Sequence, residues 1–157
     1  MEAKTVLLRL AICLIGLICL GLCIFWLPWM AEQTVELFPE VSYLKYPVLL
    51  GIYATTVPFY YALYQGLKLL GLIDAYNAFS ETAIRSLKRI KFSALIIAFL
   101  YVGGEWFLIS QNAMPPGLML LGVAIISAAV IIALFAALLQ ELLSQALKIQ
   151  KENDLTI

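Results

Sequence analysis

The sequence contains no histidine, only three cysteines in 157 residues, and charged side chains at only 13% of its positions. Without histidine it lacks the commonest metal ligand and the commonest general base near neutral pH. Cys13, Cys19 and Cys23 all fall in the first apolar segment, which argues against a disulfide framework. We find no phosphate-binding glycine loop, nucleophile–base pair or metal-ligand cluster. We therefore expect a protein that is not an enzyme and has no metal and no cofactor.

Apolar residues, by contrast, make up 64% of the chain. A soluble domain is about half apolar and about a quarter charged. A core of this size cannot hide so much apolar surface from water, so lipid must be the solvent for much of it. The lipid bilayer is therefore the first expected partner. The formal charge is zero, which gives no support for direct binding of nucleic acid, and we expect none.

Four apolar stretches, each long enough to cross a bilayer, predict an all-α integral membrane protein. We predict a single domain over residues 1–157, a four-helix bundle with spans at about 6–29, 47–72, 92–110 and 117–140. The first stretch ends in an aromatic girdle and has no small-residue cleavage site, so we interpret it as a retained helix. Pro58 should kink the second span, and Thr55 and Thr56 can bond the carbonyls freed there.

The connections between the spans differ in character. Pro39 and Pro47 argue against a continuous helix through the first loop, residues 30–46. The central segment, residues 73–91, is basic and contains a predicted helix N-cap at Ser80 with Glu81 in the first turn. From there an amphipathic pattern continues without a breaker into the third span. We expect one long helix that extends out of the bilayer into the cytoplasm, and a polar tail at 141–157.

The distribution of positive charge predicts the orientation. Two Lys or Arg residues precede the first span, one lies in the first loop, five lie around the central segment, none in the third loop and two in the tail. The positive-inside rule then places both termini and the central segment in the cytoplasm. The prediction is a multi-pass protein of the bacterial cytoplasmic (plasma) membrane.

Small residues mark two faces on which helices can approach closely. Ala129, Ala133 and Ala137 form one stripe on the fourth span, with Gly122 and Ser127 nearby. Gly16, Cys19 and Cys23 form another on the first span. The partner of each stripe stays open. The two cysteines are also a candidate thiol pair for copper(I) or disulfide exchange, although small packing residues would look the same.

A candidate polar site lies within the spans. Glu105 follows two glycines in the third span, and an ionisable residue at that depth is a functional hypothesis by default. The alternative is that Glu105 reaches the outer interface, at the level of Trp106. Polar side chains of the second span could line a pocket that opens to the cytoplasm with Lys68 at its mouth, or could simply bond to neighbouring helices. They are Tyr60, Tyr61, Tyr64 and Gln65.

A second candidate site is the charged cytoplasmic surface. Its members could contact anionic lipid or an acidic protein partner, although orientation of the chain alone would also account for the basic ones. They are Arg85, Lys88, Arg89 and Lys91 of the central segment and Glu152, Asn153 and Asp154 of the tail.

Several stretches resemble a known family. They include AFSE at 78–81, LKRIK at 87–91 and ENDLTI at 152–157, within a resemblance that covers most of the chain from Tyr46 onward. Together they are similar to the YoaS-like bacterial membrane proteins (domain of unknown function 2975), which have four predicted spans. Members are often encoded beside a small helix-turn-helix regulator of the Cro/repressor type, so the resemblance implies a cytoplasmic DNA-binding partner.

Two functions are consistent with these features. The first is a membrane-embedded regulatory protein that binds a cytoplasmic helix-turn-helix regulator, with the basic segment and the tail as the contact surface. The second is a small transporter or a resistance or immunity protein that uses Glu105. Four spans of one chain are few helices to surround a transport pathway, so the second function predicts a homo-oligomer.

Overall fold

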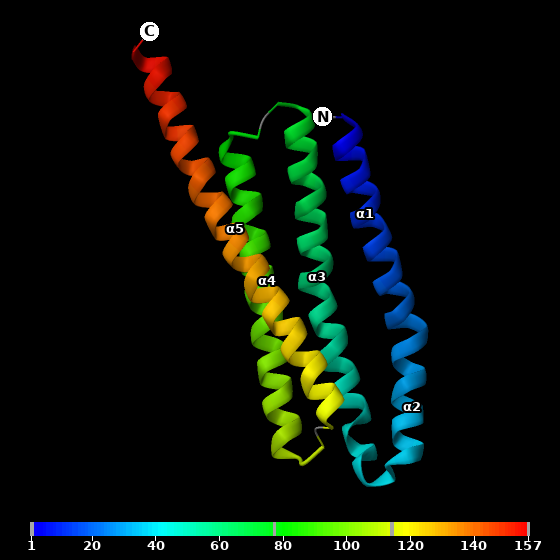
Figure 1. Ribbon diagram of the computed structural model, residues 1–157. Helices are drawn as coiled ribbons and strands as arrows, with labels where there is room; N and C mark the ends of the chain where they lie inside the picture. Colours follow the sequence, from blue (N-terminus) through cyan, green and yellow to red (C-terminus); the bar gives the residue numbers. More distant parts are fainter. Residues whose placement is uncertain (1, 77, 114, 157) are drawn as a thin grey trace.

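The computed structural model describes residues 2–76, 78–113 and 115–156, and throughout these ranges the chain is helical apart from short connections. Met1, Asn77, Met114 and Ile157 belong to the predicted N-terminal, central, third-loop and tail segments and lie outside the described residues. The long helices run lengthwise beside one another (Figure 1). Both termini and the connection at 75–80 lie at one end, and the connections at 38–44 and 111–115 lie at the other.

The first helical segment is longer than the sequence suggested. Helix α1 (Glu2–Gly21) continues through a π-helical turn η1 (Leu22–Trp26) into α2 (Leu27–Leu37). Pro28 lies in the first turn of α2, directly after the π-helical turn, and the helix continues through it. The expected loop therefore shrinks to Phe38 and the 3₁₀ turn η2 (Pro39–Leu44), and Phe38 has the extended φ of −131° that a following proline favours.

Helix α3 (Lys45–Asp74) contains Pro58 in its interior and remains helical through it. The hydroxyls of Thr55 and Thr56 each donate a 2.6 Å hydrogen bond to a backbone carbonyl three residues earlier, those of Ile52 and Tyr53. The threonines were expected to bond the carbonyl that Pro58 frees, which is that of Ala54. Their hydroxyls instead bond the carbonyls of Ile52 and Tyr53, because a helical threonine reaches the carbonyl three residues before it.

Helix α4 (Glu81–Ser110) begins where the sequence predicted. Ser80 is its N-cap, with the Ser80 hydroxyl accepting a 3.2 Å hydrogen bond from the Ala83 amide. The helix then runs unbroken for 30 residues, as the amphipathic pattern indicated. Asn112, at φ 54°, reverses the chain, and α5 (Pro116–Thr156) follows for 41 residues. The predicted polar tail is therefore helical through Thr156, and Figure 1 shows it projecting beyond the other helices.

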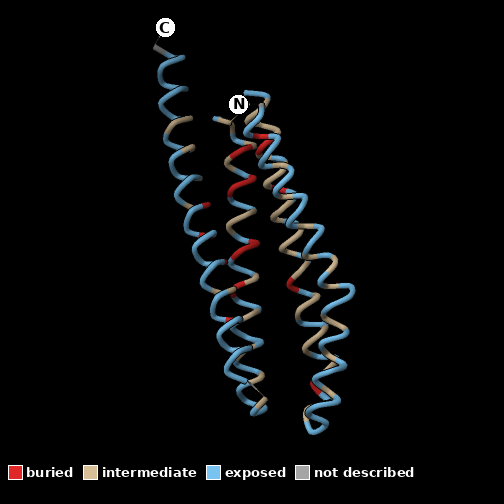
Figure 2. The backbone as a smooth tube through the Cα atoms, turned by 45° about the vertical axis from the view of Figure 1, so that its right-hand side comes forward, coloured by how far each residue is buried: buried red, intermediate tan, exposed pale blue. Residues whose placement is uncertain are grey.

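The buried residues are few and mostly small, and they concentrate along α4 and the surfaces packed against it (Figure 2). Helix α4 packs against α3 on one side and α5 on the other, whereas α1 packs against α3. On α5 the buried stripe is Ala129, Ala133 and Ala136, and Ala137 is only half-buried. The predicted stripe therefore packs on α4, and its third member is Ala136, because the helix is rotated slightly toward that side.

Three helical segments are long and apolar enough to cross a membrane: Ala3–Leu37, Glu81–Ser110 and Pro116–Leu155. None of the most apolar part of the first is buried within the protein. Helix α3 is not among them because its tyrosines, threonines and Gln65 make it more polar. Large aliphatic and aromatic side chains on the outer surfaces of these helices are exposed, which is the arrangement expected where lipid is the solvent.

Candidate functional site

A groove of about 580 Å³ lies between the N-terminal part of α4 and the C-terminal part of α5, at the end that carries both termini. Three turns of α4 form one wall. The other wall is a long face of α5 at helical spacing. The lining residues are Glu81, Ile84, Arg85 and Lys88 from α4, and Gln140, Ser144, Leu147, Lys148, Lys151, Glu152 and Leu155 from α5.

Four cations and two carboxylates line this groove. Lys151 donates a 3.3 Å hydrogen bond to Glu81 Oε1 and so ties the two walls together. Among the described residues, Arg85, Lys88 and Lys148 make no ion pair within 4.0 Å, and all three are exposed. The groove therefore has a surplus of positive charge around the apolar side chains of Ile84 and Leu147.

The structure brings together part of the predicted charged surface. Arg85, Lys88 and Glu152 line the groove, although they are far apart in the sequence. Arg89 and Lys91 lie on the same helix outside its lining, and the Lys91 ammonium stands 5.0 Å from the centre of the Phe92 ring. Asn153 and Asp154 are exposed near the end of α5 and do not line the groove.

Sequence reasoning missed the α5 wall because it assigned residues 141–157 to a polar tail and followed the helical pattern only through Leu147. Gln140, Ser144, Leu147, Lys148 and Lys151 recur at intervals of three and four residues. That spacing is the signature of one helical face. Extending the helical pattern past Leu147 would have placed Lys148 and Lys151 on the same face as Gln140 and Ser144.

Glu105 lies apart from the groove, near the other end of α4. Its carboxyl reaches α5 and packs over the backbone of Gly122, and a Cβ added at Gly122 would collide with that carboxyl. The Glu105 Oε1 atom is buried and has no hydrogen-bond partner among the described residues. The two flanking glycines, Gly103 and Gly104, are exposed and leave open space beside them.

The other predicted intramembrane residues do not gather around Glu105. Gln65 lies 20 residues from the start of α3 and Glu105 five from the end of α4, which separates them by roughly 20 Å along the helices. Gln65 is 1% exposed, and its Oε1 has no partner in the described part of the chain. Tyr64 is 59% exposed and, like Tyr61 and Lys68, turns outward.

Two tyrosines of α3 hold α1 in place. The Tyr60 hydroxyl donates a 2.7 Å hydrogen bond to the Gly16 carbonyl, and the Tyr53 hydroxyl donates one of the same length to the Cys23 carbonyl. In the π-helical turn the Leu27 amide donates to Leu22 and Pro28 has no amide hydrogen, so Tyr53 supplies the donor that the Cys23 carbonyl lacks. Tyr60 thus has the interhelical role that the sequence left open.

The cysteines pack on this same face. Cys19 and Cys23 are half-buried, Cys13 is exposed, and all three thiols are free. Within the described residues, no group of three or more His, Cys, Asp or Glu side chains is placed to hold a metal ion. The small side chains of Cys19 and Cys23 also allow the first helical segment to lie close to α3.

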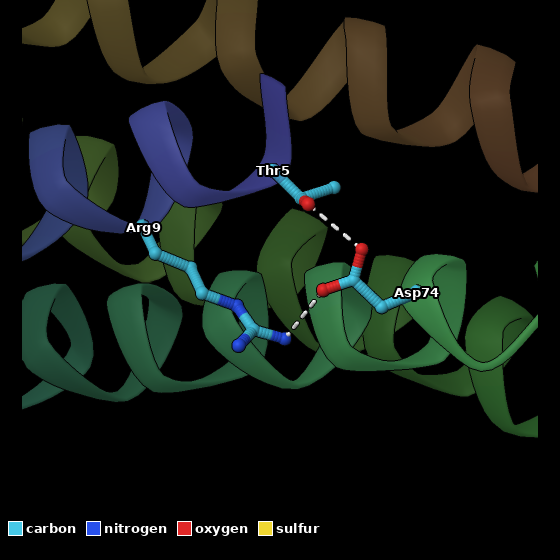
Figure 3. Close-up of polar contacts among 3 residues, drawn as sticks. All are labelled: Thr5, Arg9 and Asp74. Atoms are coloured by element: carbon cyan, nitrogen blue, oxygen red, sulfur yellow. Dashed lines mark hydrogen bonds and ion pairs between the residues drawn. The ribbon is translucent and has the colours of Figure 1, made fainter. Parts of the chain in front are cut away.

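At the end that carries the termini, a cluster of three polar residues joins α1 to α3 (Figure 3). Arg9 Nη2 lies 3.0 Å from Asp74 Oδ2, and the Thr5 hydroxyl donates a 2.7 Å hydrogen bond to Asp74 Oδ1. The guanidinium of Arg9 thus forms an ion pair at the C-terminal end of α3.

Comparison with known proteins places this arrangement in a family. A family model described as "Protein of unknown function (DUF2975)" matches residues 29–157. The chain is also 45% identical over 156 residues to a protein of Bacillus subtilis (strain 168) named "Uncharacterized membrane protein YoaS", with 98% of each chain covered. The chain belongs to the DUF2975 family. No solved structure matches it.

The range that matches the DUF2975 family includes both walls of the groove as well as Glu105 and Gly122. Arg9 of α1 and Cys23 of η1, which both contact α3, precede that range. The family resemblance expected from AFSE, LKRIK and ENDLTI is confirmed, and so is the broader expectation of a helical membrane protein.

Proposed function

We propose that this DUF2975 protein is a membrane-embedded regulatory protein that binds a helix-turn-helix regulator in the groove between α4 and α5. In this proposal α1–α2, α3, α4 and α5 each cross the bacterial cytoplasmic membrane, and both termini are cytoplasmic. Nine of the ten Lys and Arg residues belong to the end where the termini and the central connection lie, and Lys45 belongs to the other. That asymmetry supports the orientation.

The observation that carries the proposal is that three cations of the groove make no ion pair within 4.0 Å with any described residue and lie beside the apolar side chains of Ile84 and Leu147. Arg85, Lys88 and Lys148 approach one space from two helices, so an acidic segment with apolar residues would meet both kinds of surface at once. The projecting end of α5 lengthens this surface away from the rest of the protein (Figure 1). The regulator itself is suggested by the family resemblance.

The test is purification of the tagged, detergent-solubilised protein from its native cells, followed by identification of co-purifying proteins. The test variant is Arg85→Gln/Lys88→Gln. The matched control is Arg89→Gln/Lys91→Gln, which removes the same charge from the same segment but outside the groove lining. We expect a small DNA-binding protein to be recovered with the native chain and the control and lost with the test variant. Equal recovery with both variants, or none with the native chain, would contradict the proposal.

A second candidate function is a small oligomeric transporter or a resistance or immunity protein. The observation that favours it is Glu105, whose buried carboxyl oxygen has no protein partner among the described residues. The two functions are distinguished by variants at separate places. Loss of the cellular phenotype with Glu105→Gln but not with Arg85→Gln/Lys88→Gln would favour transport or resistance, and the reverse pattern would favour regulation.

A further inference from the structure

The Glu105 carboxyl occupies a space that is open only because residue 122, on the facing helix, is a glycine without a side chain. Glu105 lies on α4 five residues before Ser110, inside a segment long and apolar enough to cross a membrane. Its carboxyl group rests on the buried backbone of Gly122 in α5, and any side chain at Gly122 would displace it. The sequence and the packing therefore combine to hold an acidic group between two apolar helices.

No cation of the described chain compensates a charge at this position. Glu105 makes no ion pair within 4.0 Å with any described residue. Helix α5 carries no Asp, Glu, Lys or Arg from 116 to 140, and α4 carries none besides Glu105 from 92 to 110. Lys45, the cation at this end of α3, stands 5.4 Å from the centre of the Tyr46 ring.

The other titratable groups near this end are the exposed carboxyls of Glu32 and Glu36 on α2 and Glu40 in η2, which add no positive charge, and several phenols. On α4, Tyr101 lies one turn before Glu105. On α3, Tyr53 donates its hydroxyl hydrogen to the Cys23 carbonyl, and Tyr46 lies beneath Lys45. Tyr43 of η2 donates a 2.9 Å hydrogen bond to Gln111 Oε1. A neutral phenol cannot balance the charge of a carboxylate.

An ionised carboxylate without a cation and with a buried, unpartnered oxygen is costly in an apolar surrounding. A bound proton removes the charge. We propose that Glu105 and the Gly122 backbone form a proton-binding site within the membrane, in which a proton takes the place of the cation that the surrounding described residues do not supply. The proposal rests on α4 crossing the membrane and does not depend on the partner of the groove.

The experiment uses the chemistry of carbodiimides. Dicyclohexylcarbodiimide partitions into lipid and reacts with a protonated carboxyl. The carboxyl oxygen bonds to the central carbon, its proton moves to a nitrogen, and the acyl group then migrates to nitrogen as a stable acylurea. No atom leaves, so the peptide that contains Glu105 gains the mass of one reagent molecule. A water-soluble carbodiimide with glycine ethyl ester reports carboxyls that water reaches, for which Glu32 and Glu36 on the exposed surface of α2 are internal standards.

Native membranes are treated with each reagent across a range of pH, and the modified peptides are identified by mass spectrometry. We expect dicyclohexylcarbodiimide to modify Glu105, while the water-soluble reagent modifies Glu32 and Glu36 in preference. Glu105→Gln should abolish that modification. The proposal is overturned if Glu105 reacts with the water-soluble reagent as readily as Glu32, or if the lipid-soluble reagent leaves it unmodified at every pH.

A second pair of variants tests the role of the glycine. Gly122→Ala places a methyl group where the carboxyl lies, whereas a Cβ at Gly117, in the first turn of the same helix, meets nothing within 4 Å. We expect Gly122→Ala to reduce modification of Glu105 by dicyclohexylcarbodiimide and to increase its reaction with the water-soluble reagent. Gly117→Ala should leave both unchanged. Identical labelling of the two variants would contradict a site built on Gly122.

Discussion

The Asp74 carboxylate, at the last residue of α3, joins two residues of α1 that lie one turn apart. Its Oδ2 atom lies 3.0 Å from Nη2 of Arg9, and its Oδ1 atom accepts a 2.7 Å hydrogen bond from the Thr5 hydroxyl (Figure 3). The side chains of Arg9 and Asp74 are 43% and 30% exposed, so water weakens their attraction. The cluster nevertheless adds a polar contact at the end of α1 to the packing of α1 against α3.

This cluster predicts a graded loss of stability. Asp74→Asn keeps one oxygen for the Thr5 hydroxyl and loses the charge, and we expect it to cost about 0.5–1 kcal/mol. Asp74→Ala loses both contacts and should cost about 1–2 kcal/mol. The free energy of unfolding is measured by SDS titration in mixed micelles, followed by tryptophan fluorescence. A double-mutant cycle with Arg9→Gln should give a positive coupling energy, and a coupling of zero would show that the ion pair contributes nothing.

The two tyrosine bonds to α1 should differ in strength because their acceptors differ. The Gly16 carbonyl lies within α1 and also has a helical donor, so Tyr60→Phe should cost about 0.5 kcal/mol. The Cys23 carbonyl loses its only donor in Tyr53→Phe, which should cost about 1–2 kcal/mol. The same unfolding assay applies, with Tyr61→Phe on an exposed position of α3 as the control. Equal losses at Tyr53 and Tyr60 would argue against the role given to the π-helical turn.

Replacing a buried alanine of the α5 stripe by a larger residue should destabilise the protein, because the stripe packs against α4. Ala133 is 4% exposed, whereas Ala128 is exposed on the same helix. Ala133→Leu forces α4 and α5 apart and should cost about 1–3 kcal/mol, while Ala128→Leu should be nearly neutral because lipid accommodates it. Unfolding of the two variants is compared directly. A stable Ala133→Leu variant would mean that the two helices are free to separate at this point.

Much of the fold follows from the sequence because a segment that crosses lipid must be apolar and must satisfy its backbone hydrogen bonds as a helix. The apolar runs, the Ser80 cap and the turn before Pro116 all act through neighbouring residues, and each is found in the structure. The length of the first helix was underestimated because the loop was taken to begin at residue 30, after the aromatic girdle, whereas the helix continues to Leu37. The way in which Pro28 is accommodated was not predictable either, because it involves a π-helical turn and Tyr53, which lies on a different helix.

The candidate sites were less predictable, for a related reason. The cations of α4 were visible in the sequence, but their opposition to Lys148 and Lys151 depends on how α5 crosses α4. The depth of Glu105 within its span was also visible. That its carboxyl lies on Gly122 could not be inferred, because nothing in a single sequence states which glycine faces which side chain.

The end of α3 offers a variant that should gain stability. Tyr76 has a φ of 59°, in the left-handed region that glycine adopts without strain, and its amide donates a 3.1 Å hydrogen bond to the Ile73 carbonyl. Its side chain is 86% exposed and contributes little packing. Tyr76→Gly relieves the backbone strain, keeps that hydrogen bond and should raise the free energy of unfolding by about 0.5–1 kcal/mol.

Ala75→Gly is the matched control for Tyr76→Gly. Because Ala75 has a φ of −84°, glycine there relieves nothing and should cost stability. A loss at both positions would show that the Tyr76 ring, despite its exposure, makes contacts that matter more than the strain it imposes.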